Sequence, residues 1–181
     1  GNSLLTLAFE ILSSKNLNIN EKSKVELIKK ISECSGHSGI AGGQYSDLNF
    51  EKKKIPLQKI INMQIEKTGK LFSFCCMASL IIKNKNKYLS KFDKIGSDIG
   101  LLFQIADDII DYKGNSKHAG KKTKKDQKKG KATLIKLLGY KNTIKFGNKL
   151  KMSIFKKLNM FEDKSKDLKE TINFILERTK W

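Results

Sequence analysis

The sequence FQIADDIIDYKGNSKHAGKK, residues 103–122, holds three aspartates within five positions of an otherwise apolar segment. On a helix, Asp107 and Asp111 lie four residues apart and Asp108 and Asp111 three apart, so the three carboxylates can share one face. Their apolar neighbours predict a largely buried helix, where unpaired charge is costly. A cation would remove that cost. Mg²⁺ suits the position, because it uses one or two carboxylates together with waters and phosphate oxygens.

A run of lysines follows these aspartates and includes Lys121 and Lys131. Metal on one side and ammonium groups on the other would hold a diphosphate by electrostatic attraction. On the residues alone, an acidic patch without metal, followed by a solvated basic loop, remains an open alternative.

The fold class follows from the spacing of the apolar residues, which is helical almost throughout. The chain has one proline, and no hairpin signal separates alternating strands. We therefore predict an all-α protein of one domain. The expected helices span residues 4–14, 21–42, 55–82, 88–112, 131–140, 143–158 and 164–180, with a loop at 113–130.

Composition limits the possible partners and location. Thirty-seven basic residues against 18 acidic ones give a net charge of +19, which suits an anionic partner, although a biased composition alone would also produce it. Three cysteines without zinc-finger spacing indicate reduced thiols and a cytoplasmic protein. The longest apolar run, residues 72–82, is too short for a transmembrane segment.

Several motifs occur in an order that resembles a known family. They are LLTLAFEIL (4–12), GGQYSDL (42–48), EKTGKLF (66–72), GLLFQIADDIIDY (100–112), GKKTKKDQKKGKAT (120–133) and FILERTKW (174–181). Together they closely resemble the trans-isoprenyl diphosphate synthases, the polyprenyl synthetase family, of the bacterial farnesyl/geranylgeranyl diphosphate synthase type. Leu134 and Ile135 stand where many members have Tyr-Pro.

The resemblance implies an isoprenoid synthase bundle of about six to eight helices around a central cavity. Residues 1–181 would form the C-terminal part of one such domain, because the family's first aspartate-rich motif is absent from the chain. We expect apolar surface to be exposed where further helices of that domain would pack. The implied reaction is Mg²⁺-dependent condensation of an allylic diphosphate with isopentenyl diphosphate, in a protein that forms homodimers when intact.

The resemblance also implies roles for individual residues. Metal binding falls to Asp107, Asp108 and Asp111, and diphosphate binding to Lys67, Lys121 and Lys131. The Thr68 hydroxyl, the Lys67 carbonyl and the Gln104 amide would face the allylic cation. The remaining expected cavity residues are Gln44, Asp47 and Phe103, with Arg178 and Lys180 on a tail that closes the site.

Two other functions stay open. A catalytically incomplete partner subunit of a full-length prenyl synthase would suit a chain without the first aspartate-rich motif. A basic helical nucleic-acid-binding protein would explain the charge. It would not explain aspartates on an apolar helix, and the chain has no recognisable nucleic-acid-binding motif.

Overall fold

The computed structural model describes residues 1–113 and 133–178, and these confirm the all-α prediction, with no strand in either range. The α-helices are α1 (Asn2–Ser13), α2 (Glu21–Ser35), α3 (Ile40–Phe50), α4 (Leu57–Gln64), α5 (Lys70–Ile82), α6 (Leu89–Lys113), α9 (Leu134–Leu138), α10 (Tyr140–Leu158) and α11 (Lys166–Glu177). A π-helix, η1 (Ile65–Gly69), joins α4 to α5, and the 3₁₀ segments are η2 (Asn86–Tyr88) and η3 (Asn159–Ser165).

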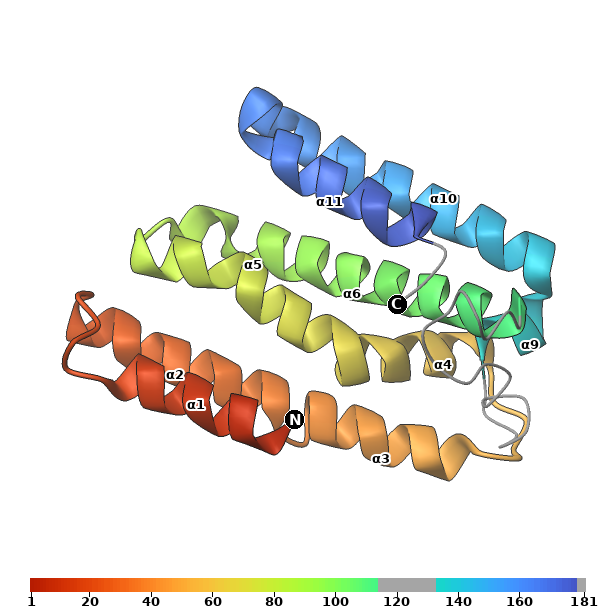
Figure 1. The fold of residues 1–181 in the computed structure, drawn as a ribbon, viewed down its shortest axis with the longest axis horizontal. Helices are drawn as coiled ribbons and strands as arrows, with labels where there is room; N and C mark the ends of the chain where they lie inside the picture. Colours follow the sequence, from red (N-terminus) through yellow and green to blue (C-terminus); the bar gives the residue numbers. More distant parts are fainter. Residues whose placement is uncertain (114–132, 179–181) are drawn as a thin grey trace.

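Helix α6 lies in the middle of the molecule (Figure 1). It packs against α5 and η1 on one side and against α10 and α11 on the other. Helices α1 and α2 lie beyond α5 and form an outer layer with α3. The aspartates of α6 lie near its C-terminal end, close to α9.

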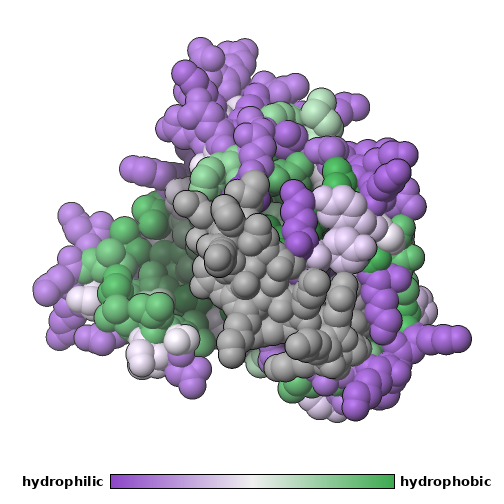
Figure 2. Space-filling model, turned by 45° about the vertical axis from the view of Figure 1, so that its right-hand side comes forward, coloured by the Kyte–Doolittle hydropathy of each residue, from purple (hydrophilic) through white to green (hydrophobic). Residues whose placement is uncertain are grey.

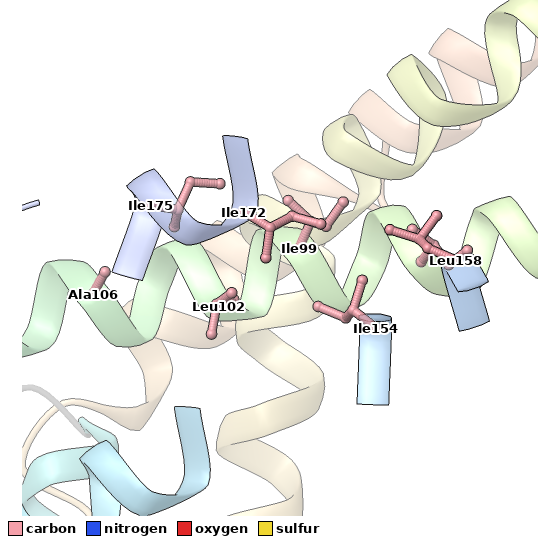
Figure 3. Close-up of a cluster of buried hydrophobic side chains, with 8 residues drawn as sticks. Ile99, Leu102, Ala106, Ile154, Leu158, Ile172 and Ile175 are labelled. Atoms are coloured by element: carbon pink, nitrogen blue, oxygen red, sulfur yellow. The ribbon is translucent and has the colours of Figure 1, made fainter. Parts of the chain in front are cut away.

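The core explains why α6 is central. Ile95, Ile99, Leu102 and Ala106 recur at helical spacing and pack against α10 and α11 through Ile154, Leu158, Ile172 and Ile175 (Figure 3). On another face, Leu101 and Ile105 pack against α4. With apolar contacts on opposite sides, α6 is the largely buried helix that the sequence predicts.

The predicted single helix over residues 21–42 is wrong. Helix α2 ends at Ser35, and α3 begins at Ile40. At Gly39 a Cβ atom would lie 1.9 Å from the Cys34 carbonyl oxygen, so the turn between the two helices requires glycine. Gly42 and Gly43, which the sequence interpretation treated as a helix end, lie inside α3.

Gly43 allows close packing between α3 and η1. A Cβ atom there would lie 2.2 Å from the Lys67 backbone nitrogen, a distance that real side chains do not reach. We predict that Gly43→Ala lowers the free energy of unfolding by about 1–3 kcal/mol, because overpacking outweighs the gain in helix propensity. Urea unfolding followed by circular dichroism measures this change. Ala41→Ser, on the exposed side of α3, is the control, and equal stability of both variants would contradict the prediction.

The other predicted boundaries need smaller corrections. The predicted helix 55–82 is continuous in space but begins at Leu57, after Pro56, and contains the π-helix η1. The predicted helix 131–140 is α9, which spans Leu134–Leu138 within the described residues. Gly139, with a φ of 78°, separates α9 from α10, which begins three residues earlier than predicted.

Several large apolar side chains are exposed, most of all on α1. None of the α1 residues is buried, and Leu4 is 71% exposed. Large apolar side chains are also exposed on α3 and α5, namely Tyr45, Leu48 and Leu71. Figure 2 shows a hydrophobic area at the lower left of the molecule.

Two sequence expectations concern cysteines and membranes. Cys34, Cys75 and Cys76 are all free thiols, and burial raises the pKa of the Cys76 thiol to about 11. Among the described helices, none combines the length and the apolar character needed to cross a bilayer.

Candidate active site

The π-helix η1 presents Lys67 and Thr68 to the rest of the site. A single π turn inside α-helical structure is rare and is often found at functional positions. The Lys67 ammonium nitrogen lies 2.6 Å from the Asp47 Oδ2 atom, and the Asp47 side chain is only 8% exposed. The close packing of α3 on η1 therefore brings together two predicted site residues that are 20 positions apart.

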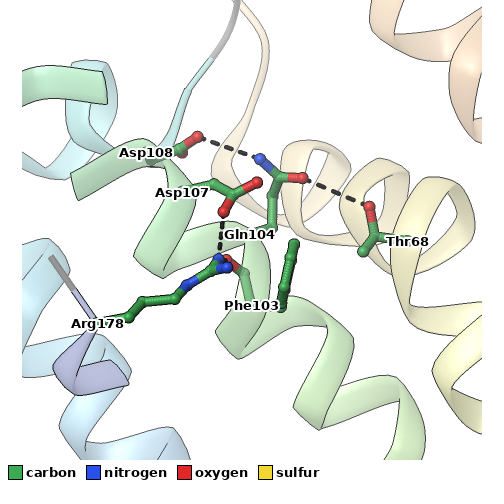
Figure 4. Close-up of polar contacts among 6 residues, drawn as sticks. All are labelled: Thr68, Phe103, Gln104, Asp107, Asp108 and Arg178. Carbon is green, nitrogen blue, oxygen red and sulfur yellow. Dashed lines mark hydrogen bonds and ion pairs between the residues drawn. The ribbon is translucent and has the colours of Figure 1, made fainter. Parts of the chain in front are cut away.

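Thr68, Gln104 and Asp108 form a row of hydrogen bonds between η1 and α6 (Figure 4). The Thr68 hydroxyl donates to the Gln104 Oε1 atom at 3.4 Å, and the Gln104 Nε2 atom donates to Asp108 Oδ1 at 3.4 Å. Both bonds are long, so each is weak. The row nevertheless brings the three side chains together between η1 and α6.

Asp108 is buried and also contacts α9. Its second carboxylate oxygen accepts a hydrogen bond from the Leu134 backbone N–H at 3.3 Å. The side chains of Leu134 and Ile135 are buried beneath this contact, so the departure from the family's Tyr-Pro leaves α9 packed on α6. This contact was not predicted, although Thr133 is a recognisable helix N-cap whose hydroxyl accepts from the Lys136 N–H.

Asp107 pairs with Arg178, the residue that follows α11 (Figure 4). The guanidinium also donates to the Phe103 carbonyl oxygen at 3.3 Å and lies 3.9 Å from the centre of the Phe103 ring. The Phe103 ring is in turn 5.5 Å from the ring of Phe72. The C-terminal end of α11 thus reaches the aspartates of α6.

The expected three-carboxylate metal site stays a prediction. Asp111 is buried, and in the ranges 1–113 and 133–178 no group of three or more His, Cys, Asp and Glu side chains is arranged to hold a metal ion. Asp107 and Asp108 still offer oxygen ligands, and the arginine on Asp107 shows that this carboxylate binds a cation in this conformation. The pair fits Mg²⁺, which needs one or two carboxylates when phosphate oxygens and waters supply the rest.

Four further residues belong to the predicted site. Gln44 lies on α3, one turn before Asp47, with an exposed side chain. Lys121, Lys131 and Lys180 lie outside the described residues. Their expected roles stay predictions.

Comparison with known proteins identifies the family. A sequence profile of the polyprenyl synthetase family matches residues 1–175. The chain is 33% identical to farnesyl diphosphate synthase of Micrococcus luteus and 32% identical to that of Escherichia coli, over 99% of its own length and 62% of theirs.

Solved structures give the same result. A geranyltransferase from Helicobacter pylori, complexed with magnesium and isoprenyl diphosphate, matches with a TM-score of 0.82 and 29% identity, over 97% of this chain and 57% of that one. An FPP/GFPP synthase from Zymomonas mobilis matches with a TM-score of 0.81 and 34% identity, over 96% and 58%. The chain thus spans about three fifths of the length of these relatives, and it belongs to the polyprenyl synthetase family.

Proposed function

We propose that the protein containing this chain is a Mg²⁺-dependent trans-prenyltransferase that condenses an allylic diphosphate with isopentenyl diphosphate. The observation that carries the proposal is the row from Thr68 through Gln104 to Asp108, beside Asp107. This row places carboxylates, which can bind a metal ion, next to the neutral oxygen dipoles of Thr68 and Gln104. The names of relatives such as the Micrococcus luteus farnesyl diphosphate synthase support the same reaction class.

Binding of the allylic diphosphate would fall to charged residues at both ends of the site. Asp107 and Asp108, with Asp111 as a third candidate, would hold Mg²⁺, which neutralises the leaving diphosphate when bound. The Lys67 ammonium group and the Arg178 guanidinium would pair with diphosphate oxygens, because charge-assisted hydrogen bonds to phosphate are strong. Lys121 and Lys131 are expected to add to this binding.

Thr68 and Gln104 would act on the cation that forms as the diphosphate leaves. The Thr68 hydroxyl donates its proton to the Gln104 carbonyl, so the lone pairs of the hydroxyl oxygen remain available to a positive charge. The Gln104 amide lies between Thr68 and Asp108 and makes one long hydrogen bond to each. Dipoles held in place before the reaction stabilise developing charge without reorganisation, which is a major source of catalysis.

A transfer assay tests the proposal. The protein that contains this chain is incubated with geranyl diphosphate, radiolabelled isopentenyl diphosphate and Mg²⁺, and the apolar product is counted with and without EDTA. Metal-dependent product is the expected result. Saturable binding of Mg²⁺–pyrophosphate without turnover would favour the incomplete partner subunit instead. The absence of both turnover and binding would contradict the proposal.

A further inference from the structure

Arg178 is held by groups on one face of α6. Its guanidinium contacts the Asp107 carboxylate, the Phe103 carbonyl oxygen and the Phe103 ring. The side chains of Arg178 and Asp107 are only 10% and 16% exposed, so solvent screens their attraction less than that of a surface ion pair. A divalent metal ion that binds Asp107 must therefore compete with an arginine already in place.

The backbone at Arg178 allows the side chain to leave without disturbing the helix. Helix α11 ends at Glu177, and Arg178 has extended dihedral angles, φ −59° and ψ 139°. Its amide still donates to the Phe174 carbonyl oxygen. Changes in the side-chain rotamers of Arg178 would release Asp107 while α11 remains packed on α6 through Ile172 and Ile175.

Lys67 differs from Arg178 in this respect. The Lys67 ammonium group pairs with Asp47 on α3, a residue that is not among the proposed metal ligands. Removing Lys67 would leave the carboxylate of Asp107 paired as before. Of these two cations, only Arg178 occupies a carboxylate that the metal ion also needs.

We propose that Arg178 exchanges partners during ligand binding: it competes with divalent metal ions for Asp107 in the free protein and moves to the diphosphate when the metal–diphosphate complex binds. This inference rests on the proposed function. An arginine pairs more strongly with a diphosphate than with a single carboxylate, because the diphosphate carries more negative charge and offers more acceptor oxygens. The exchange therefore makes metal binding depend on the diphosphate.

The proposal predicts effects of opposite sign for one substitution. In Arg178→Met, Mn²⁺ alone should bind about fivefold more tightly than to the unchanged chain, because a cation that competes for Asp107 is gone. Mn²⁺–pyrophosphate should bind about tenfold more weakly, because one charged partner of the diphosphate is lost. For both ligands, the affinity of Arg178→Lys should lie between that of the unchanged chain and that of Arg178→Met.

Electron paramagnetic resonance titration of free Mn²⁺ measures both affinities on the 181-residue chain. Lys166→Met is the matched control, because it removes one charge from an exposed position at the other end of the same helix. It should change neither affinity. Circular dichroism melting verifies that each variant is folded. If Arg178→Met does not fold, Arg178→Lys and Arg178→Gln are measured in its place.

The outcomes separate this inference from the proposed function. Unchanged or weaker binding of Mn²⁺ alone by Arg178→Met overturns the exchange. If the asparagine variants of Asp107 and Asp108 bind Mn²⁺ more weakly in the same experiment, the proposed metal site is supported even though the exchange by Arg178 is not. If those variants bind Mn²⁺ as the unchanged chain does, both the metal site and the exchange are overturned.

Discussion

Replacing Asp107 and Asp108 together with asparagine should weaken binding of Mg²⁺–pyrophosphate to the chain by about two orders of magnitude. Each charged interaction contributes roughly 1.5–3 kcal/mol, and every 1.4 kcal/mol is about tenfold in affinity. Asparagine keeps the size of each side chain, and at position 108 its carbonyl oxygen can still accept from either the Gln104 amide or the Leu134 N–H, but not from both. The loss would therefore report on charge rather than on packing.

Isothermal titration calorimetry measures this affinity, with Asp167→Asn as the control. Asp167 lies in the first turn of α11 with an exposed side chain. Its substitution removes one negative charge away from the site, whereas the double variant removes two within it. The control should bind as the unchanged chain does. Equal losses in both proteins would mean that net charge, rather than the aspartates of α6, determines binding.

Leu102→Ala should cost about 2–5 kcal/mol of the free energy of unfolding. Leu102 is fully buried on α6, within the cluster that also contains Ile154 of α10 and Ile172 of α11 (Figure 3). Truncation to alanine removes buried methyl groups and leaves a cavity that the surrounding helices fill only in part. A urea unfolding curve followed by circular dichroism gives the change in free energy.

Leu4→Ala provides the comparison for this loss. The same atoms are removed from α1, where Leu4 is 71% exposed, and surface substitutions usually change stability by less than about 0.5 kcal/mol. A difference of at least 1.5 kcal/mol between the two variants is expected. Similar stabilities would contradict the placement of α6 at the centre of the core.

The sequence predicts most of the fold because its helices have strong apolar periodicity. The apolar neighbours of the aspartates predicted a largely buried helix, and Ile99, Leu102 and Ala106 of α6 are indeed buried. The break between α2 and α3 was missed although its cause is local: the turn requires Gly39, next to the Cys34 carbonyl oxygen. Gly42 and Gly43 are helix breakers by propensity, yet they lie inside α3, where Gly43 allows η1 to approach.

The membership of the candidate site stays a prediction that rests on the family resemblance, while several of its contacts could not be predicted. Of the expected residues, Lys67 and Thr68 lie on η1, and Thr68 is hydrogen-bonded through Gln104 to Asp108 on α6. Periodicity within one helix cannot show which distant residues meet. The pairing of Asp107 with Arg178 joins positions 71 residues apart, and the π-helix at Lys67 has no local sequence signal.

The central claim is that the aspartates of α6 bind a metal–diphosphate complex, and the most direct test is the position of the metal. Crystals of the chain grown with Mn²⁺ and pyrophosphate allow the ion to be located by its anomalous scattering. We predict a peak at about 2.1 Å from carboxylate oxygens of Asp107 or Asp108, as in Mg²⁺ sites, with pyrophosphate oxygens also coordinating. A fully occupied Mn²⁺–pyrophosphate complex bound elsewhere, with Asp107 still paired to Arg178, would contradict the claim.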